Sequence, residues 1–136
     1  MAKIIMLLPL LTAIEQVESD RGATSKNLYQ IRRVYVDDVN RIQEWNERKG
    51  DMIVGTLPRF TYEDVTSREK SSEMIKIYWT FYGDIYTRTT GKPLTYEVLA
   101  RMHNGGGENG WRRACTVPYW GKVKRELEKA GVNCEG

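Results

Sequence analysis

Apolar residues recur at helical spacing in five stretches of this chain. In the first stretch Leu7, Leu10 or Leu11, Ile14 and Val17 are three or four residues apart, which predicts an amphipathic helix. Pro9 suits the first turn of such a helix, and Gly22 is expected to stop it, so the last turn lies near Asp20.

The second stretch begins after Tyr29-Gln30-Ile31. Its predicted apolar stripe consists of Ile31, Tyr35, Val39 and Ile42, extended by Trp45. The segment 48–59 contains Gly50, Gly55 and Pro58 and is predicted to be a loop with a short extended piece at Met52–Val54.

The third stretch is the most apolar. Two start signals precede it, Thr61-x-x-Asp64 and Thr66-x-x-Glu69, the second of which is a capping-box pattern. Its apolar positions cover most of the helix circumference, which places this helix at the centre of the fold. These positions are Met74, Ile75, Ile77, Tyr78, Trp79, Phe81, Tyr82, Ile85 and Tyr86.

Two shorter helices complete the pattern. Thr95 can cap a helix that carries Val98, Leu99 and Met102 inward and breaks after His103-Asn104 into three glycines, 105–107. The last helix starts around Pro118 and directs Tyr119 or Trp120, Val123 and Leu127 inward before Gly131. The predicted fold class is mainly α, a single compact helical domain over residues 1–136 with little or no sheet.

Composition supports this picture without choosing a function. The chain has 136 residues, 40% of them hydrophobic and 29% charged, as in an ordinary one-domain globule. Its net charge is +3, yet six basic residues and the single acid Glu108 lie between Arg101 and Arg125. Such a segment attracts anionic partners, and charge alone does not choose among them. A nucleic-acid partner is not expected.

Cysteine and hydropathy patterns exclude other classes. Cys115 and Cys134 are too few for a disulfide scaffold, and with one histidine in the chain no metal site and no cofactor are expected. Whether the two cysteines pair stays open. The N-terminal run IIMLLPLL is too short to span a bilayer and is not a convincing signal peptide.

Glu18 is the candidate for acid–base chemistry. It lies in the last turn of the first predicted helix, four residues after Ile14, on the flank of the apolar face. Partial burial and the negative end of the helix dipole both disfavour its charged form, so we expect its pKa to be raised. A glutamate that keeps its proton near neutral pH can act as a general acid. Glu15 is expected to be solvent exposed, and Asp37 and Asp38 to be solvated or salt-bridged.

Three blocks resemble one superfamily in the same order. The segment Ala13–Ser19 resembles the AI-x-x-ES helix end that carries the catalytic glutamate in lysozyme-like proteins, and Leu28–Ile31 resembles their YQI block. The stretch ARMHNGG followed by T-x-x-Y-W-x-K-V is similar to the HNGGPNG and YW-x-KV motifs of invertebrate-type lysozymes and to the YNAG segment of soluble lytic transglycosylases. By this resemblance the chain is identified as a member of the lysozyme-like superfamily.

The resemblance implies roles for further residues. Tyr29 and Gln30 would line the site beside Glu18, and Ser19 could orient its carboxyl group. Tyr119 would pack behind or beside the glutamate. The facing wall would be formed by His103, Asn104, Gly105 and Gly106. Asp20 is a candidate second carboxylate, and Glu108 a weaker one.

The resemblance also implies an activity. It points to a muramidase, a bacteriolytic glycoside hydrolase that cleaves the β-1,4 bond of peptidoglycan, with chitin-like polymers a secondary possibility. Lytic transglycosylases use a single glutamate, and that mechanism stays open, as does a non-catalytic glycan-binding domain. A monomer that is secreted, periplasmic or acts at the cell wall is expected, with peptidoglycan or another N-acetylglucosamine-containing glycan as partner.

Overall fold

The computed structural model describes residues 6–21 and 26–133, and of residues 19–21 only the backbone. Five α-helices follow one another along the chain: α1 (Leu8–Arg21), α2 (Arg33–Lys49), α3 (Arg68–Thr90), α4 (Tyr96–Gly105) and α5 (Val117–Lys129). Three short 3₁₀ helices join them, η1 (Tyr62–Thr66), η2 (Gly110–Arg112) and η3 (Ala114–Thr116). The described residues form no strand, and the predicted mainly-α fold class is confirmed.

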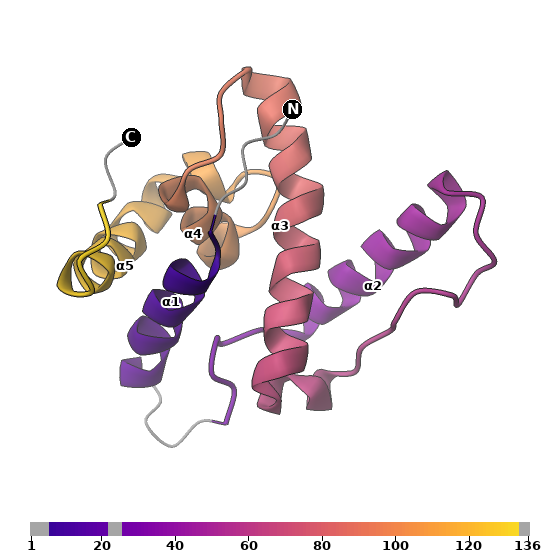
Figure 1. Cartoon of the computed structure of the whole chain (residues 1–136), viewed down its shortest axis with the longest axis horizontal. Helices are drawn as coiled ribbons and strands as arrows, with labels where there is room; N and C mark the ends of the chain where they lie inside the picture. The colour runs from indigo at the N-terminus through magenta and orange to yellow at the C-terminus, as the bar shows by residue number, and fades with distance from the viewer. Residues whose placement is uncertain (1–5, 22–25, 134–136) are drawn as a thin grey trace.

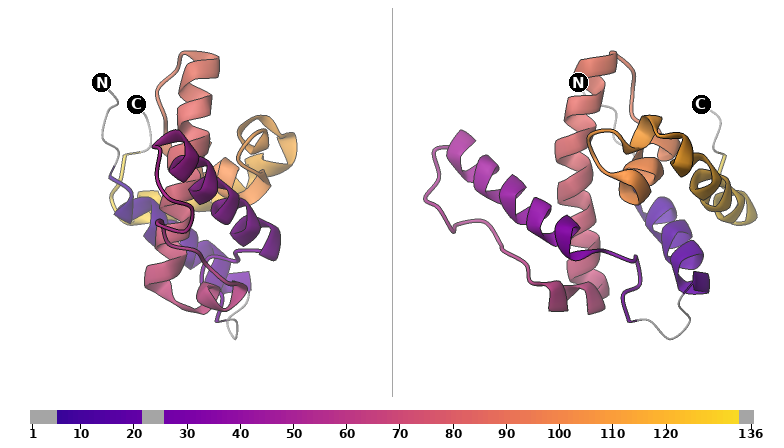
Figure 2. Two further views of the ribbon diagram at one scale, coloured as in Figure 1. Left: turned by 90° about the vertical axis from the view of Figure 1, so that its right-hand side faces the viewer. Right: turned by 180° about the vertical axis from the view of Figure 1, so that it is seen from behind.

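Helix α3 stands at the centre of the arrangement. Helices α1, α4 and α5 pack together on one side of it, while α2 contacts α3 on the other side and diverges from it toward the C-terminal end of α2 (Figures 1 and 2). The predicted central position of the third helix is thus confirmed. Because α2 leaves the body of the fold at an angle, the molecule has a V-shaped outline when viewed as in Figure 1.

The predicted apolar stripes form one core. The buried set includes Ile14 and Val17 from α1, Val39 and Ile42 from α2, and Leu99 and Met102 from α4. One prediction is wrong: Trp45 does not extend the stripe of α2, because its side chain is 55% exposed. It lies on the part of α2 that has left the body of the fold.

The loop after α2 folds back onto that helix. Glu47 is fully buried, and its carboxylate accepts hydrogen bonds from the backbone N–H groups of Gly55 (2.9 Å) and Leu57 (2.7 Å) and from Arg59 (2.6 Å). The guanidinium of Arg59 and these N–H groups lower the pKa of Glu47 to about 2. The extended piece predicted at Met52–Val54 is absent from this loop, which is held by turns around the carboxylate instead.

Capping differs from the prediction at the start of α3. The Thr61–Asp64 pair forms a capping box, but on the short helix η1, with the Thr61 N–H donating to Asp64 Oδ2 at 2.8 Å. The cap of α3 is Ser67, whose Oγ accepts from the Lys70 N–H, so Thr66 ends η1 and caps nothing. Thr95 caps α4 as predicted, and Gly91 ends α3 with φ 69°.

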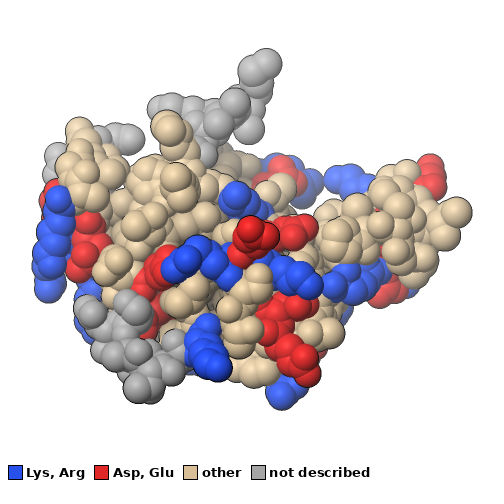
Figure 3. Space-filling view, turned by 60° about the horizontal axis from the view of Figure 1, so that its bottom comes forward, with Lys and Arg blue, Asp and Glu red and all other residues tan. Residues whose placement is uncertain are grey.

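Two arginines of the predicted basic segment have internal partners, of which Glu97 alone carries an opposite charge. Arg101 is largely buried and donates to Glu97 (2.8 Å) and to Thr116 Oγ1 (2.8 Å), while Arg112 donates to Asn109. Figure 3 shows a face of the molecule on which Lys and Arg side chains alternate with Asp and Glu. The surface in this view has no extended patch of one sign.

Candidate functional site

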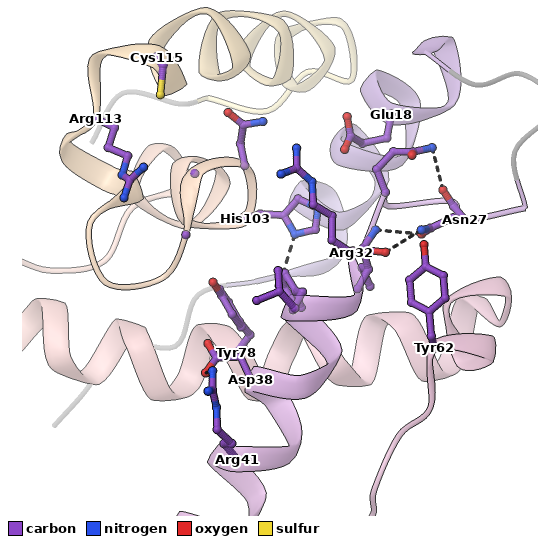
Figure 4. A pocket seen from close by; sticks show the side chains of 17 residues that line it. Glu18, Asn27, Arg32, Asp38, Arg41, Tyr62, Tyr78, His103, Arg113 and Cys115 are labelled. Carbon is purple, nitrogen blue, oxygen red and sulfur yellow. Dashed lines mark hydrogen bonds and ion pairs between the residues drawn. The ribbon is translucent and has the colours of Figure 1, made fainter.

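A cavity of about 610 Å³ lies between the end of α1, the chain leading into α2 and the end of α4. This volume falls within the range of small-molecule sites. Its walls come from segments far apart in the sequence (Figure 4). The lining residues are Glu18, Asn27, Gln30, Ile31, Arg32, Val34, Tyr35, Asp38, Arg41, Tyr62, Tyr78, His103, Asn104, Gly105, Gly106, Arg113 and Cys115.

Glu18 occupies the predicted place on α1. Its neighbours along the apolar face, Ile14 and Val17, are buried in the core, and Glu18 itself is only 5% exposed. Figure 4 shows its carboxyl group directed into the cavity. The predicted position on the flank of the apolar face is confirmed, because core packing on one side leaves the carboxyl group facing the cavity on the other.

His103 joins the two walls. Its Nε2 lies 2.8 Å from the Tyr29 carbonyl oxygen, which only accepts hydrogen bonds, so Nε2 carries the hydrogen. The Tyr35 hydroxyl lies 3.4 Å from Nδ1 and donates to it. Burial lowers the pKa of His103 to about 4, so the imidazole is neutral at ordinary pH. His103 therefore positions the chain of Tyr29 against α4.

The turn before α2 presents Gln30 to the cavity in an uncommon conformation. Gln30 has φ 52°, in the left-handed region. Asn27 holds the turn, since its Oδ1 accepts from the Ile31 N–H (2.9 Å) and its Nδ2 donates to the Ile31 carbonyl (2.7 Å). Gln30 Nε2 donates in turn to the Asn27 carbonyl (3.1 Å). Strained residues fixed in this way are frequent at functional sites.

The glycine run forms part of the facing wall and is closely packed. Asn104, Gly105 and Gly106 line the cavity, with Gly106 ending α4 at φ 105°. A Cβ at Gly105 would lie 2.3 Å from Thr116 Cγ2, and one at Gly107 would lie 2.1 Å from the ring of Tyr82. The packing of this chain therefore requires glycine at both positions.

Asp38 marks the other end of the cavity, and the sequence did not predict it there. The hydroxyl of Tyr82 donates to Asp38 Oδ2 (2.5 Å), and Arg41 forms an ion pair with Oδ1 (2.9 Å), which confirms the predicted salt bridge. In Figure 4 the side chains of Asp38 and Glu18 come from opposite ends of the cavity, with Arg32 between them. The signal that could have indicated Asp38 is its spacing, three residues after the buried Tyr35, on the flank of the same stripe.

Tyrosines line the floor beside Asp38. The rings of Tyr35 and Tyr78 stack with centroids 3.9 Å apart, and the Gly107 N–H donates to the Tyr78 hydroxyl at 2.7 Å. Burial raises the pKa of Tyr78 to about 12, so this hydroxyl stays protonated. The floor thus links α2 and α3 to the glycine run.

Some predicted site residues do not reach the cavity. The Tyr29 carbonyl accepts a hydrogen bond from His103, but the buried Tyr29 side chain is not part of the lining. Tyr119, which is buried, and Glu108, which is exposed, do not line the cavity either. Ser19 and Asp20 have side chains outside the described residues. Glu15 is not fully solvent exposed as predicted, because it pairs with Arg68 at 2.5 Å and its side chain is 20% exposed.

Other chemistry is limited in the described part of the chain. No group of three or more His, Cys, Asp or Glu side chains in residues 6–18 and 26–133 is arranged to hold a metal ion. None of the helices that the structure describes is both long and apolar enough to cross a membrane. Cys115 is exposed and lines the cavity, and Cys134 lies outside the described residues.

Comparison with known proteins identifies no relative. No protein-family model matches this chain, and no curated protein or solved structure matches it either. The functional argument therefore depends on the cavity itself.

Proposed function

We propose that this protein cleaves the β-1,4 glycosidic bond of peptidoglycan, with Glu18 as the general acid. One observation carries the proposal: the buried carboxyl group of Glu18 and the His103–Gly106 wall face the same cavity although 85 positions separate Glu18 from His103. The three sequence blocks that resemble lysozyme-like proteins thus lie together in space.

The proposed reaction begins with proton transfer from Glu18 to the glycosidic oxygen. Glu18 is the acid in this step because its buried carboxyl group faces the cavity in which the glycosidic oxygen would lie. The bond from the anomeric carbon to that oxygen breaks, and positive charge develops on the sugar ring. The Asn104 amide and the main-chain groups of Gly105 and Gly106 are available on the facing wall to bind the N-acetyl group of the sugar.

A second carboxylate distinguishes the two ways to complete the reaction. A hydrolase places it within about 5 to 9.5 Å of the acid, where it either activates a water that bonds to the anomeric carbon or bonds to that carbon itself until water displaces it. Among the described side chains that line the cavity, only Glu18 and Asp38 are carboxylates, and Asp38 is held at the other end by Tyr82 and Arg41. This separation favours, as the second candidate, a lytic transglycosylase in which Glu18 acts alone and a group of the substrate traps the ring cation.

The site of action follows from the substrate. Peptidoglycan lies outside the cytoplasmic membrane, so we propose that a monomer acts after secretion, in the periplasm or at the cell wall. A non-catalytic glycan-binding domain is the alternative from another class, and it predicts binding without any cleaved product.

The test is the Glu18→Gln variant on purified sacculi. Glutamine keeps the size of the side chain and removes the acidic proton, so we expect activity to fall by about 10²- to 10⁴-fold while circular dichroism stays unchanged. Glu15→Gln, on the same helix but outside the cavity, is the matched control and should retain activity. Undiminished activity in Glu18→Gln would remove this residue from the mechanism.

Mass analysis of the products separates the candidates. A reducing end identifies the hydrolase, an anhydro-muramyl end identifies the transglycosylase, and bound but uncleaved glycan identifies the binding domain.

A further inference from the structure

Two arginines at the cavity differ from most arginines of this protein. Across the part of the chain that the structure describes, the typical arginine side chain has an internal partner. Arg32, Arg113 and Arg125 are the described arginines without a hydrogen bond, ion pair or ring contact of their side chains. Two of these three, Arg32 and Arg113, line the same cavity.

Their placement directs positive charge into the cavity. Arg32 is the residue just before α2, and Arg113 lies at the junction of η2 and η3, so the two arginines belong to separate segments. In Figure 4 the Arg32 side chain rises through the middle of the cavity toward Glu18, and Arg113 lies on the glycine side. Arg41, the third arginine of the lining, is already paired with Asp38.

An arginine without an internal acid partner has five N–H donors available for an oxygen anion. A neutral sugar could not form an ion pair with Arg32 or Arg113. A guanidinium and a carboxylate form charge-assisted, often bidentate hydrogen bonds, which are stronger than bonds between neutral groups. The two side chains therefore suit a glycan that carries carboxylates along its length.

We infer that Arg32 and Arg113 are specificity-determining residues that bind carboxylate substituents of the glycan and so favour an anionic strand over neutral chitin. This inference rests on the proposed function. The carboxylate has two possible sources in peptidoglycan, the lactyl carboxyl group of a muramic sugar that bears no peptide and the carboxyl groups of the peptide where one is attached. Both present the same chemistry to a guanidinium.

The experiment measures binding by calorimetry in the full-length chain with Glu18→Gln, so that bound glycan is not cleaved. Three probes of matched length are compared. Chitohexaose is neutral, peptide-free glycan strands carry charge only on their lactyl groups, and the third probe is the same strands with their peptides. We expect both charged strands, or one of them, to bind at least about tenfold more tightly than chitohexaose, and the stronger strand identifies the source of the carboxylate.

The variants are Arg32→Gln and Arg113→Gln, with Arg125→Gln as the matched control, an exposed arginine on α5 that is not part of the lining. Each cavity variant should lose about fivefold in affinity for the charged strand, the size of an exposed ion pair, and leave chitohexaose binding unchanged. Arg→Lys at either position should restore part of the loss, and added salt should weaken only the charged strand.

Three results would each overturn the inference. The cavity variants could lose equal affinity for charged and neutral glycan, or lose no affinity at all. The parent chain could also bind charged and neutral glycan equally well. The wild-type chain is assayed for cleavage in parallel. If it cleaves no glycan yet binds the charged strand selectively through these arginines, the proposed function fails and the assignment of the arginines stands.

Discussion

Gly107 offers the sharpest test of how the glycine run is packed. A Cβ at this position would lie 2.1 Å from Cδ2 and 2.2 Å from Cγ of Tyr82, well inside van der Waals contact. Gly107 is not among the residues with positive φ, so alanine suits its backbone and the clash is the only cost. Relief requires the Tyr82 ring to move, which threatens its hydrogen bond to Asp38.

The structure sets the size of the effect. Overpacking of this kind costs about 1 to 3 kcal/mol, and loss of a hydrogen bond to a charged group costs a similar amount. We therefore expect Gly107→Ala to lower the free energy of unfolding by about 1 to 3 kcal/mol, measured by urea denaturation with circular dichroism. The melting temperature should fall by at least about 3 °C.

Gly121→Ala is the matched control for this prediction. Gly121 lies inside α5, where a Cβ would meet nothing within 4 Å, so alanine should stabilise the helix by up to about 1 kcal/mol. In a Tyr82→Ala background the cost of Gly107→Ala should largely vanish, because the clashing ring is gone. A Gly107→Ala protein as stable as wild type, or an unchanged cost in that background, would refute the packing argument.

Two further predictions concern pH. The pKa of Glu47 is lowered to about 2 from an ordinary value of 4.5, so its contribution to stability is complete above pH 4.5 and is lost as the pH falls toward 2. Urea denaturation of Glu47→Gln between pH 6 and pH 2.5 should show a shallower acid loss than wild type, and equal slopes would contradict this. His103 is the single histidine of the chain, so NMR can follow its titration directly. Since its folded pKa of about 4 lies below the ordinary 6.5, protonation favours unfolding, and stability is lost as the pH falls from 6.5 to 4. A midpoint near 6.5 would show that the imidazole is not buried.

The local pattern of apolar residues was sufficient to predict the helices and the position of Glu18 on α1. The spacing of Ile14 and Val17 determines which side of α1 enters the core, and Glu18 follows at the edge of that side. Thr95 acts through a bond to its own neighbour Val98, so its role as a cap could also be predicted.

Features that depend on how helices cross could not be predicted. Trp45 continues the stripe of α2 in sequence, but α2 diverges from α3 before this residue can be covered. Glu47 resembles a solvated residue at a helix end, and only the returning loop with Leu57 and Arg59 buries it. The spacing of Asp38 after Tyr35 places it on the flank of the stripe of α2, but only the packing of α2 against the other helices makes that flank a wall of the cavity.

The hydrogen bond from His103 to the Tyr29 carbonyl spans 74 positions of the chain. During synthesis, a polypeptide that has emerged only as far as α3 contains Glu18 but not the opposite wall of the cavity, which His103 to Gly106 form. Helix α4 must therefore be synthesised before the cavity can form. Incomplete chains that end before α4 are expected to lack it.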